Sequence, residues 1–175
     1  VTTVEGEFVA KCKVVVTNPM KTITLDKNEL TILVSQQATL VATITPADAD
    51  EKTILWSSSN SSVASVVNGE VKALKVGKAT IYAKNVEGTI ADSCVVTVDP
   101  IAVTGITLDA TELTLNVSQT DTLIATIAPE DATDKSVTWA SDNEQVATVA
   151  NGVVTAVAAG TANITVTTTD GGFKA

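Results

Sequence analysis

Val66-Val67-Asn68-Gly69-Glu70-Val71 is the stretch that decides the fold of this 175-residue chain. An Asn-Gly pair between strand-forming residues predicts a two-residue hairpin turn of type I′, because both central positions of that turn need a positive φ. The same pattern returns later in the chain as Val149-Ala150-Asn151-Gly152-Val153-Val154. The sequence therefore predicts hairpins at equivalent places in two copies of one unit.

The similarity between the two copies extends far beyond the hairpins. One constant shift, which places Ile23 on Ile106, aligns residues 23–88 with residues 106–171 without a gap, and 33 of the 66 aligned positions are identical. Agreement of this extent indicates a tandem duplication.

A third, partial copy opens the chain, since Cys12 matches Cys94 when Val4 is placed on Val86. We predict one domain at 19–99, a second at 100–175 that lacks its last strand, and at 1–18 the final strands of a preceding repeat, or a donor strand. Because neither end falls at a boundary between repeats, we expect these 175 residues to be an internal or processed piece.

Strand periodicity runs through each unit. Apolar residues alternate with polar ones at a period of two, as expected when one face of a sheet is buried. The clearest inward-facing sets are Leu30, Ile32 and Val34; Leu40, Ala42 and Ile44; Ala79, Ile81 and Ala83; and Cys94, Val96 and Val98. With 29 threonines and 26 valines, the composition also favours strands. We predict an all-β chain whose units are sandwiches of two antiparallel sheets.

The motifs in each unit keep one order along the chain. In the first unit they are Ile23-Thr24-Leu25-Asp26, Trp56-x-Ser-x-Asn-x-x-Val-Ala-x-Val, Asn68-Gly69 and Cys94-Val95-Val96-Thr97-Val98. This order resembles the bacterial immunoglobulin-like (Ig-like) group 2 family over 20–98, over 101–175 without the last strand, and over 1–17 as that strand alone. The resemblance implies tandem Ig-like sandwiches, as in bacterial surface proteins, invasin and intimin stalks and some phage structural proteins. It implies no shared catalytic residue and no obligatory cofactor.

Charge and composition reduce the number of function classes that are open to this chain. The chain has 11 lysines, no arginine and no histidine against 20 acidic residues, a net charge of −9. This charge repels phosphate backbones and disfavours nucleic-acid binding. Without histidine, Ser-His-Asp, Cys-His and histidine-ligated zinc sites are excluded. No apolar run approaches the roughly 18 residues that a membrane helix needs, so we expect no membrane insertion within this segment.

Two residue types recur one repeat apart and could mark sites. Cys12 and Cys94 share the parity of inward-facing valines, which predicts small buried hydrophobic side chains. Equivalent points of successive domains should be too far apart for a disulfide. Trp56 and Trp139 are predicted to be packing centres of the two cores, with a sugar-stacking platform as the functional alternative.

Acidic residues near turns raise the question of calcium, which takes six to eight oxygen ligands. The candidates are Asp48, Asp50 and Glu51, their counterparts Glu130, Asp131 and Asp134, the pair Asp142 and Glu144, and Asp99 at the joint. No spacing matches an EF-hand loop, and aspartate is common in turns for conformational reasons. We therefore assign no catalytic, cofactor or metal residue and keep calcium as an open alternative.

The joints between units favour a spacer function. Val98-Asp99-Pro100-Ile101 runs almost directly into the next repeat, and a proline without a Gly/Ser linker predicts a semi-rigid, elongated array. We expect a non-enzymatic spacer of a bacterial cell-surface or extracellular filament protein, with adjacent Ig-like repeats as partners. The alternative is an adhesin that binds a glycan or protein receptor through end loops 57–62 and 140–145. An enzyme is the least favoured alternative.

The chain ends allow a further hypothesis. Residues 8–16 repeat the strand that the second unit lacks, so a neighbouring molecule could donate them to that unit. The competing interpretation is that the 175 residues are a window of a longer covalent array. The sequence leaves both open.

Overall fold

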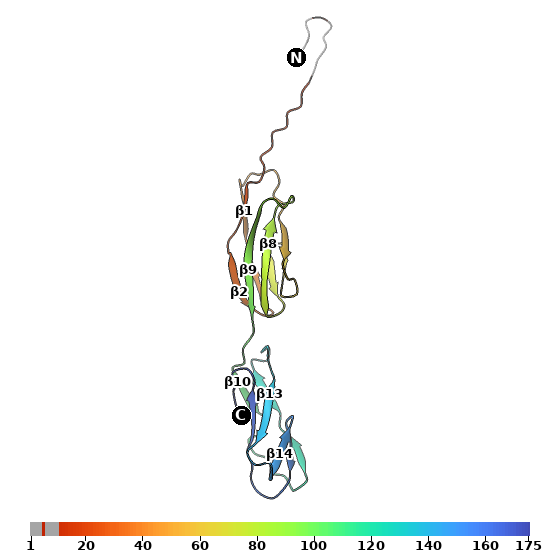
Figure 1. Ribbon diagram of the computed structural model, residues 1–175, viewed down its shortest axis with the longest axis vertical. Coiled ribbons are helices and arrows are strands. Elements are labelled where there is room, and N and C mark those ends of the chain that lie inside the picture. Colours follow the sequence, from red (N-terminus) through yellow and green to blue (C-terminus); the bar gives the residue numbers. More distant parts are fainter. Residues whose placement is uncertain (1–4, 6–10) are drawn as a thin grey trace. The chain divides into compact units, whose positions relative to one another are not determined.

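The computed structural model describes residue 5 and residues 11–175, and it divides into two units, Val1–Thr97 and Val98–Ala175 (Figure 1). None of the described residues lies in a helix, so the predicted all-β class is confirmed. The described part of the chain accordingly contains no helix that could cross a bilayer.

Unit 1 is built from nine strands in three sheets, and the last strand continues two residues past Thr97. The strands are β1 (Thr22–Leu25), β2 (Glu29–Leu33), β3 (Gln37–Thr39), β4 (Ala42–Thr45), β5 (Leu55–Ser58), β6 (Ala64–Val67), β7 (Glu70–Ala73), β8 (Gly77–Lys84) and β9 (Ala91–Asp99). The largest sheet has the order β2-β9-β8-β5, and the others are β3-β7-β6 and the antiparallel pair β1-β4. The strand β9 therefore lies inside a sheet, between β2 and β8.

The core of unit 1 lies between these sheets. Strands β8 and β9 bury alternate side chains, as their period of two predicts. The completely or almost completely buried side chains are Leu40, Ala64, Val71, Ala73, Ile81, Ala83, Cys94, Val96 and Val98. Three of these nine come from β9 alone, so this strand is central to the core.

Asn68 and Gly69 form the predicted turn between β6 and β7. Their φ angles are 50° and 85°, and Val67 pairs with Glu70 across the turn. Asn151 and Gly152 have the same φ angles in unit 2. The two hairpins predicted from the Asn-Gly pairs are confirmed.

Unit 2 repeats this architecture with two strands fewer. Its strands are β10 (Gly105–Leu108), β11 (Thr120–Thr122), β12 (Ala125–Ala128), β13 (Val137–Ser141), β14 (Ala147–Ala150), β15 (Val153–Ala156) and β16 (Ile164–Thr168). Residues 112–116, the counterpart of β2, form no strand. The last three residues, Phe173–Ala175, return alongside β16, at the place where β9 begins in unit 1. Without the rest of that strand, residues 112–116 have no ladder to join.

The N-terminal segment differs from the expected pair of final strands. Residues 1–4 and 6–10, which include part of the strand expected at 8–16, lie outside the described residues. Residues 11–17 are exposed and belong to no strand. A strand needs hydrogen bonds to a neighbour, and no described segment of the chain pairs with these residues.

Candidate functional site

The aspartates of the Ile-Thr-Leu-Asp motif stabilise backbone turns and do not form a binding site. Asp26 accepts a hydrogen bond from the N–H of Val41 at 2.7 Å, and Asp109 accepts the equivalent bond from Ile124 at 2.8 Å. The Lys27 ammonium beside Asp26, together with the Val41 N–H, lowers the pKa of that carboxyl. Each aspartate thus fixes the bend after the first strand of its unit.

The end loops are held in the same way. In loop 57–62, Asn60 accepts hydrogen bonds at its side-chain oxygen from the backbone and hydroxyl of Ser62. In loop 140–145, Asn143 accepts the N–H of Gln145 at 3.3 Å. These polar side chains stabilise the turns of the loops that we considered for receptor binding.

The acidic residues considered for calcium are spread over separate turns. Among residues 5 and 11–175, no three His, Cys, Asp or Glu side chains come together as a metal site. Three of the carboxylates instead accept short hydrogen bonds that lower their pKa: Glu51 from Thr53, Asp134 from Ser136, and Asp142 from Asn163. Their positions are explained by turn geometry.

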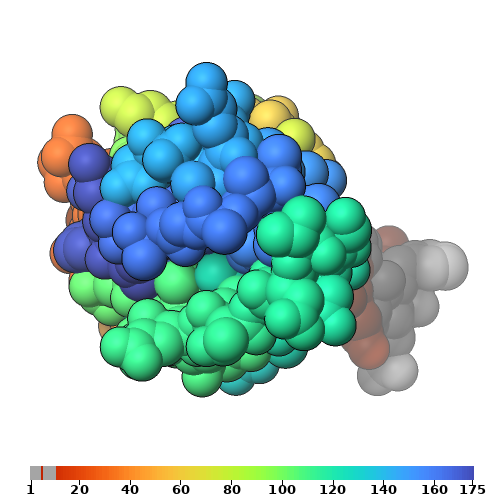
Figure 2. Space-filling view, turned by 90° about the horizontal axis from the view of Figure 1, so that it is seen from below, coloured from red at the N-terminus to blue at the C-terminus, as the bar shows by residue number. Residues whose placement is uncertain are grey.

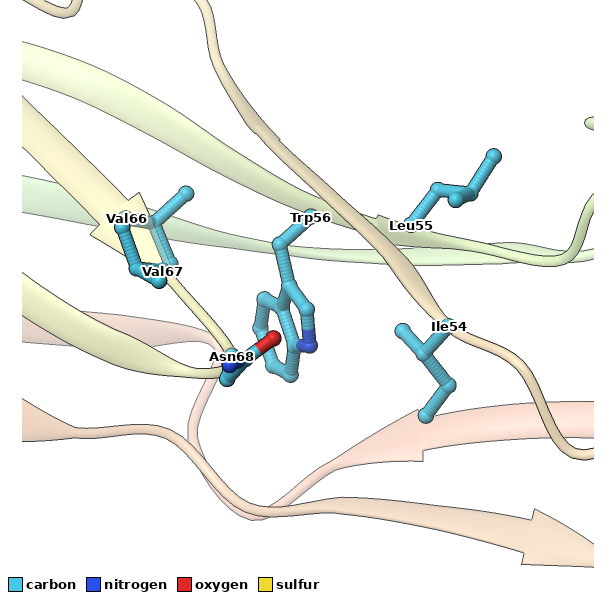
Figure 3. Close-up of a pocket in the computed structure, with 6 residues that line it drawn as sticks. All are labelled: Ile54, Leu55, Trp56, Val66, Val67 and Asn68. Atoms are coloured by element: carbon cyan, nitrogen blue, oxygen red, sulfur yellow. The ribbon is translucent and has the colours of Figure 1, made fainter.

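Trp56 lines a small hollow rather than the centre of the core. The hollow has a volume of about 290 Å³ and is bounded by Ile54–Trp56 and Val66–Asn68. Figure 3 shows the indole between Ile54 and Asn68, while Leu55 points to the other side of the strand. Trp56 and its counterpart Trp139 are both half-buried, so neither indole is among the fully buried side chains of the core.

The indole packs on the hairpin turn. A Cβ on Gly69 would stand 3.2 Å from Cζ2 of Trp56, so the indole of β5 reaches the turn between β6 and β7 in the other sheet. The counterpart Gly152 has the same relation to Trp139, at 3.3 Å. A hollow lined by a half-buried indole is a surface on which a sugar ring could stack.

The two cysteines differ although they occupy matching sequence positions. Cys94 is fully buried on β9, and burial raises the pKa of its thiol. Cys12 is exposed, so the prediction of an inward-facing side chain is wrong for it, because residues 11–17 join no sheet in this structure. Both thiols are free.

An open groove lies in unit 2, at the place that β9 occupies in unit 1. It has a volume of about 890 Å³. One wall is formed by residues 106–108 and 110–115 and the other by residues 160–164, with Ala175 also contacting the groove. Figure 2 looks onto this unit, and a hollow separates its green segment from the blue strands.

A comparison of matching residues in the two units shows which side chains are more exposed at the groove. Ile32 of β2 is 9% exposed, whereas Leu115 at the same position of unit 2 is more exposed, and Leu113 reaches 36%. Ile81 is fully buried and its counterpart Ile164 is only half-buried. The same loss affects the counterparts of Leu25, Val63, Ala64, Ala73 and Ala79.

Positions away from the groove keep their burial. Val71 and Val154 are both buried, as are Leu40 and Leu123. The sequence pattern predicted that unit 2 lacks its last strand, but it did not reveal that residues 112–116 would lose their strand as well. This second loss follows from the pairing of β2 with β9 in unit 1, because residues 112–116 have no such partner strand in unit 2.

Two sandwiches of antiparallel strands in tandem, each with the motif residues in its turns, define a multidomain Ig-like protein. The model of the bacterial Ig-like domain (group 2) family matches residues 19–98 and 102–175. The chain belongs to this family and contains the domain twice.

Relatives of the chain include proteins of different kinds. An uncharacterized protein of Clostridium acetobutylicum is 40% identical over 152 residues, which are 85% of this chain and 16% of that protein. The Ig-like virion protein of Serratia phage KSP90 is 39% identical over 159 residues, 87% of this chain and 62% of that protein. The α-L-arabinofuranosidase of Bifidobacterium longum is 49% identical over 76 residues, 43% of this chain and 7% of that enzyme. The chain spans less than two thirds of each relative.

Proposed function

We propose that this chain is a non-enzymatic structural segment of a bacterial cell-surface protein or of a virion, in which Ig-like units act as spacers. The observation that carries the proposal is the short, anchored joint. The strand β9 ends at Asp99, and Ile101 already exchanges two hydrogen bonds of 2.8 Å with Thr133. Pro100 alone lies between, and its φ is fixed by its ring.

The start of unit 1 has the same anchor. Asn18 donates its N–H to the Asp50 carboxylate and accepts the N–H of Asp50 at 3.0 Å. An anchor that recurs at the start of both units supports a repeated joint with few free dihedral angles. Such a joint suits a spacer better than a flexible tether.

The types and positions of the ionisable side chains support a non-enzymatic role. The sequence contains no histidine. In the described part of the chain, acidic side chains form no group of three, and those with lowered pKa hold turns. The α-L-arabinofuranosidase of Bifidobacterium longum shares only a short stretch with this chain, which is 7% of that enzyme.

Small-angle scattering and ¹⁵N relaxation of the chain test the spacer. We expect both units to tumble with one common correlation time and the scattering profile to be that of a narrow ensemble. A variant with six Gly/Ser residues inserted between Asp99 and Pro100 is the matched control and should tumble as two independent bodies. If the unmodified chain already behaves like this variant, the spacer proposal is wrong.

The Trp56 hollow favours a second candidate, a glycan-binding module. Val67, which lines this hollow, is 68% exposed, whereas unit 2 has the smaller Ala150 at this position. Oligosaccharide titration should therefore change the fluorescence of Trp56 in a Trp139→Phe variant and not that of Trp139 in a Trp56→Phe variant. Unchanged fluorescence in both variants would exclude this candidate.

A further inference from the structure

We propose that Asn68 and Asn151 are sites of spontaneous deamidation, and that the hairpin turn of each unit suppresses the reaction while that unit is folded. Each site then records how often its own hairpin opens. This chemistry goes beyond the spacer function and does not depend on it. The proposal rests on the geometry of the two Asn-Gly turns, which contain the only Asn-Gly pairs in the sequence.

An asparagine that precedes a glycine can react with its own backbone. The backbone nitrogen of the glycine attacks Cγ of the asparagine and loses its proton to solvent hydroxide. A C–N bond forms, the bond between Cγ and the amide nitrogen breaks, and ammonia leaves after taking a proton from water. The product is a five-membered succinimide, which water then opens. Glycine favours the attack because it has no side chain beside the nitrogen.

The reacting groups are accessible in both turns. Asn68 and Asn151 are exposed, so water and hydroxide reach them. No described residue forms a hydrogen bond with either side-chain amide. A type I′ turn is closed by a bond between its first and last residues, so the N–H groups of Gly69 and Gly152 take no part in it. The conformation of the turn therefore decides whether the groups can meet.

The turn holds the two groups apart. The φ angles of 50° at Asn68 and 85° at Gly69 match a type I′ turn, in which ψ of the first central residue is about 30°. At this ψ the nitrogen of Gly69 and Cβ of Asn68 lie on nearly opposite sides of the Cα–C bond between them. The succinimide ring needs both on the same side. Asn68 must therefore rotate about this bond by almost half a turn before it can react.

Tertiary contacts prevent this rotation in the folded unit. Leu40 donates its N–H to the carbonyl of Gly69 at 2.9 Å, and the equivalent bond in unit 2 is also 2.9 Å. The indole of Trp56 covers the turn from the other sheet, 3.2 Å from the place of a Cβ on Gly69. Rotation at Asn68 would carry the Gly69 peptide away from both partners. The hairpin must therefore detach from its neighbours before the ring can form.

Asn60 is an internal reference for the two sites. It is exposed as well, but serine follows it in the sequence. Its side-chain oxygen accepts hydrogen bonds from the backbone and the hydroxyl of Ser62, at 3.2 and 2.6 Å. We therefore expect Asn60 to react more slowly than Asn68 when the chain is unfolded, because the Ser61 side chain hinders the attacking nitrogen.

Deamidation would make an opening of the hairpin permanent. Water opens the succinimide at one carbonyl to give aspartate and at the other to give isoaspartate, whose side-chain carbon becomes part of the backbone. The turn has little room for a longer backbone, since a Cβ on Gly69 would already stand 2.5 Å from the Leu40 carbonyl oxygen. Isoaspartate at residue 68 should therefore prevent the hairpin from forming again.

Incubation of the 175-residue chain in mildly alkaline buffer, with and without guanidinium chloride, tests the proposal. Peptide mapping by mass spectrometry measures the mass gain of amide-to-acid conversion at each asparagine. In guanidinium, Asn68 and Asn151 should react faster than Asn60, and in native buffer both should react at least about tenfold more slowly than in guanidinium. Equal rates in the two buffers, or no preference for the two sites in guanidinium, would overturn the proposal.

Two matched variants test whether each site follows its own hairpin. Val71 and Val154 are buried at equivalent positions, and Val71→Ala or Val154→Ala leaves both Asn-Gly pairs intact. In native buffer, Val71→Ala should raise the rate at Asn68 about tenfold without changing that at Asn151, and Val154→Ala should do the reverse.

The rates in guanidinium should be the same in both variants and in the wild type, which separates opening of the hairpin from intrinsic reactivity. A variant whose unit does not fold should react at the guanidinium rate in that unit alone. If the native rates do not follow the stability of the unit that contains the site, the reaction proceeds in the folded turn and the proposal is wrong.

Discussion

Leu40 donates its backbone N–H to the carbonyl of Gly69 at 2.9 Å, and Leu123 makes the same bond to Gly152 at 2.9 Å. This bond brings the hairpin turn so close to the neighbouring segment that a Cβ on Gly69 would stand 2.5 Å from the Leu40 carbonyl oxygen. The turn that the Asn-Gly pair predicts is therefore also a point of tertiary packing.

Gly69→Ala should destabilise unit 1 by about 3 kcal/mol, because it adds a backbone clash to a positive φ of 85°. Gly88→Ala is the matched control, since Gly88 also has a positive φ but open space around its Cβ position. It should cost only about 1 kcal/mol. Denaturant unfolding of both variants measures the difference, and equal losses would show that the close approach to Leu40 has no energetic role.

Ile81→Ala and Ile164→Ala should differ in cost although they change matching residues. Ile81 is fully buried, so its truncation should cost about 4 kcal/mol, whereas the half-buried Ile164 should cost about 2 kcal/mol. Guanidinium unfolding should resolve unit 2 as the less stable transition. Identical costs would mean that the groove is closed in solution.

Asp142 should make unit 2 sensitive to acid. Hydrogen bonds from Asn163 lower its pKa below the ordinary 3.8, so its stabilising effect is present above that value and is lost as the pH falls through the folded-state pKa. Unit 1 has Ser59 at this position, which accepts the N–H of Thr80 at 2.8 Å without a charge.

Asp142→Ser therefore provides a non-titrating version of the same turn. The difference in free energy of unfolding between wild type and this variant should shrink between pH 7 and about pH 3. Chemical denaturation at several pH values measures it. A difference that stays constant with pH would contradict a lowered pKa for Asp142.

Cys12 and Cys94 should react with alkylating reagents at very different rates. In dilute solution Cys12 is exposed and should be modified quickly, whereas Cys94 is buried and its thiol pKa is raised, which leaves little reactive thiolate. Mass spectrometry should find one modified thiol in the native protein and two after denaturation. Rapid modification of Cys94 would indicate that β9 opens readily.

The hairpin, the strand periodicity and the duplication could all be predicted from the sequence. Asn68 and Gly69 define their turn locally, because few other residues tolerate positive φ at both positions. Strand faces follow from a period of two, which is a property of the extended backbone itself. The roles of Asp26 and Asn60 could not be predicted this way, because their hydrogen-bond partners follow from how the chain bends.

Strand periodicity also could not predict where the indoles lie. Trp56 has the parity of an inward residue, and at the edge of its sheet this places the indole against the hairpin turn of the other sheet. Parity predicts the side of the strand on which a side chain lies, but it does not predict which residues that side chain contacts.

By itself, the sequence determined local conformation and the identity of the two units, since these depend on residues close together in the chain. Only the tertiary structure determined which residues of the two units are buried. Ile81 and Ile164 are the same residue in the same motif, and Cys12 and Cys94 match in the same way. Their environments differ because burial depends on a neighbouring strand, which is present beside Ile81 and Cys94 and absent beside Ile164 and Cys12.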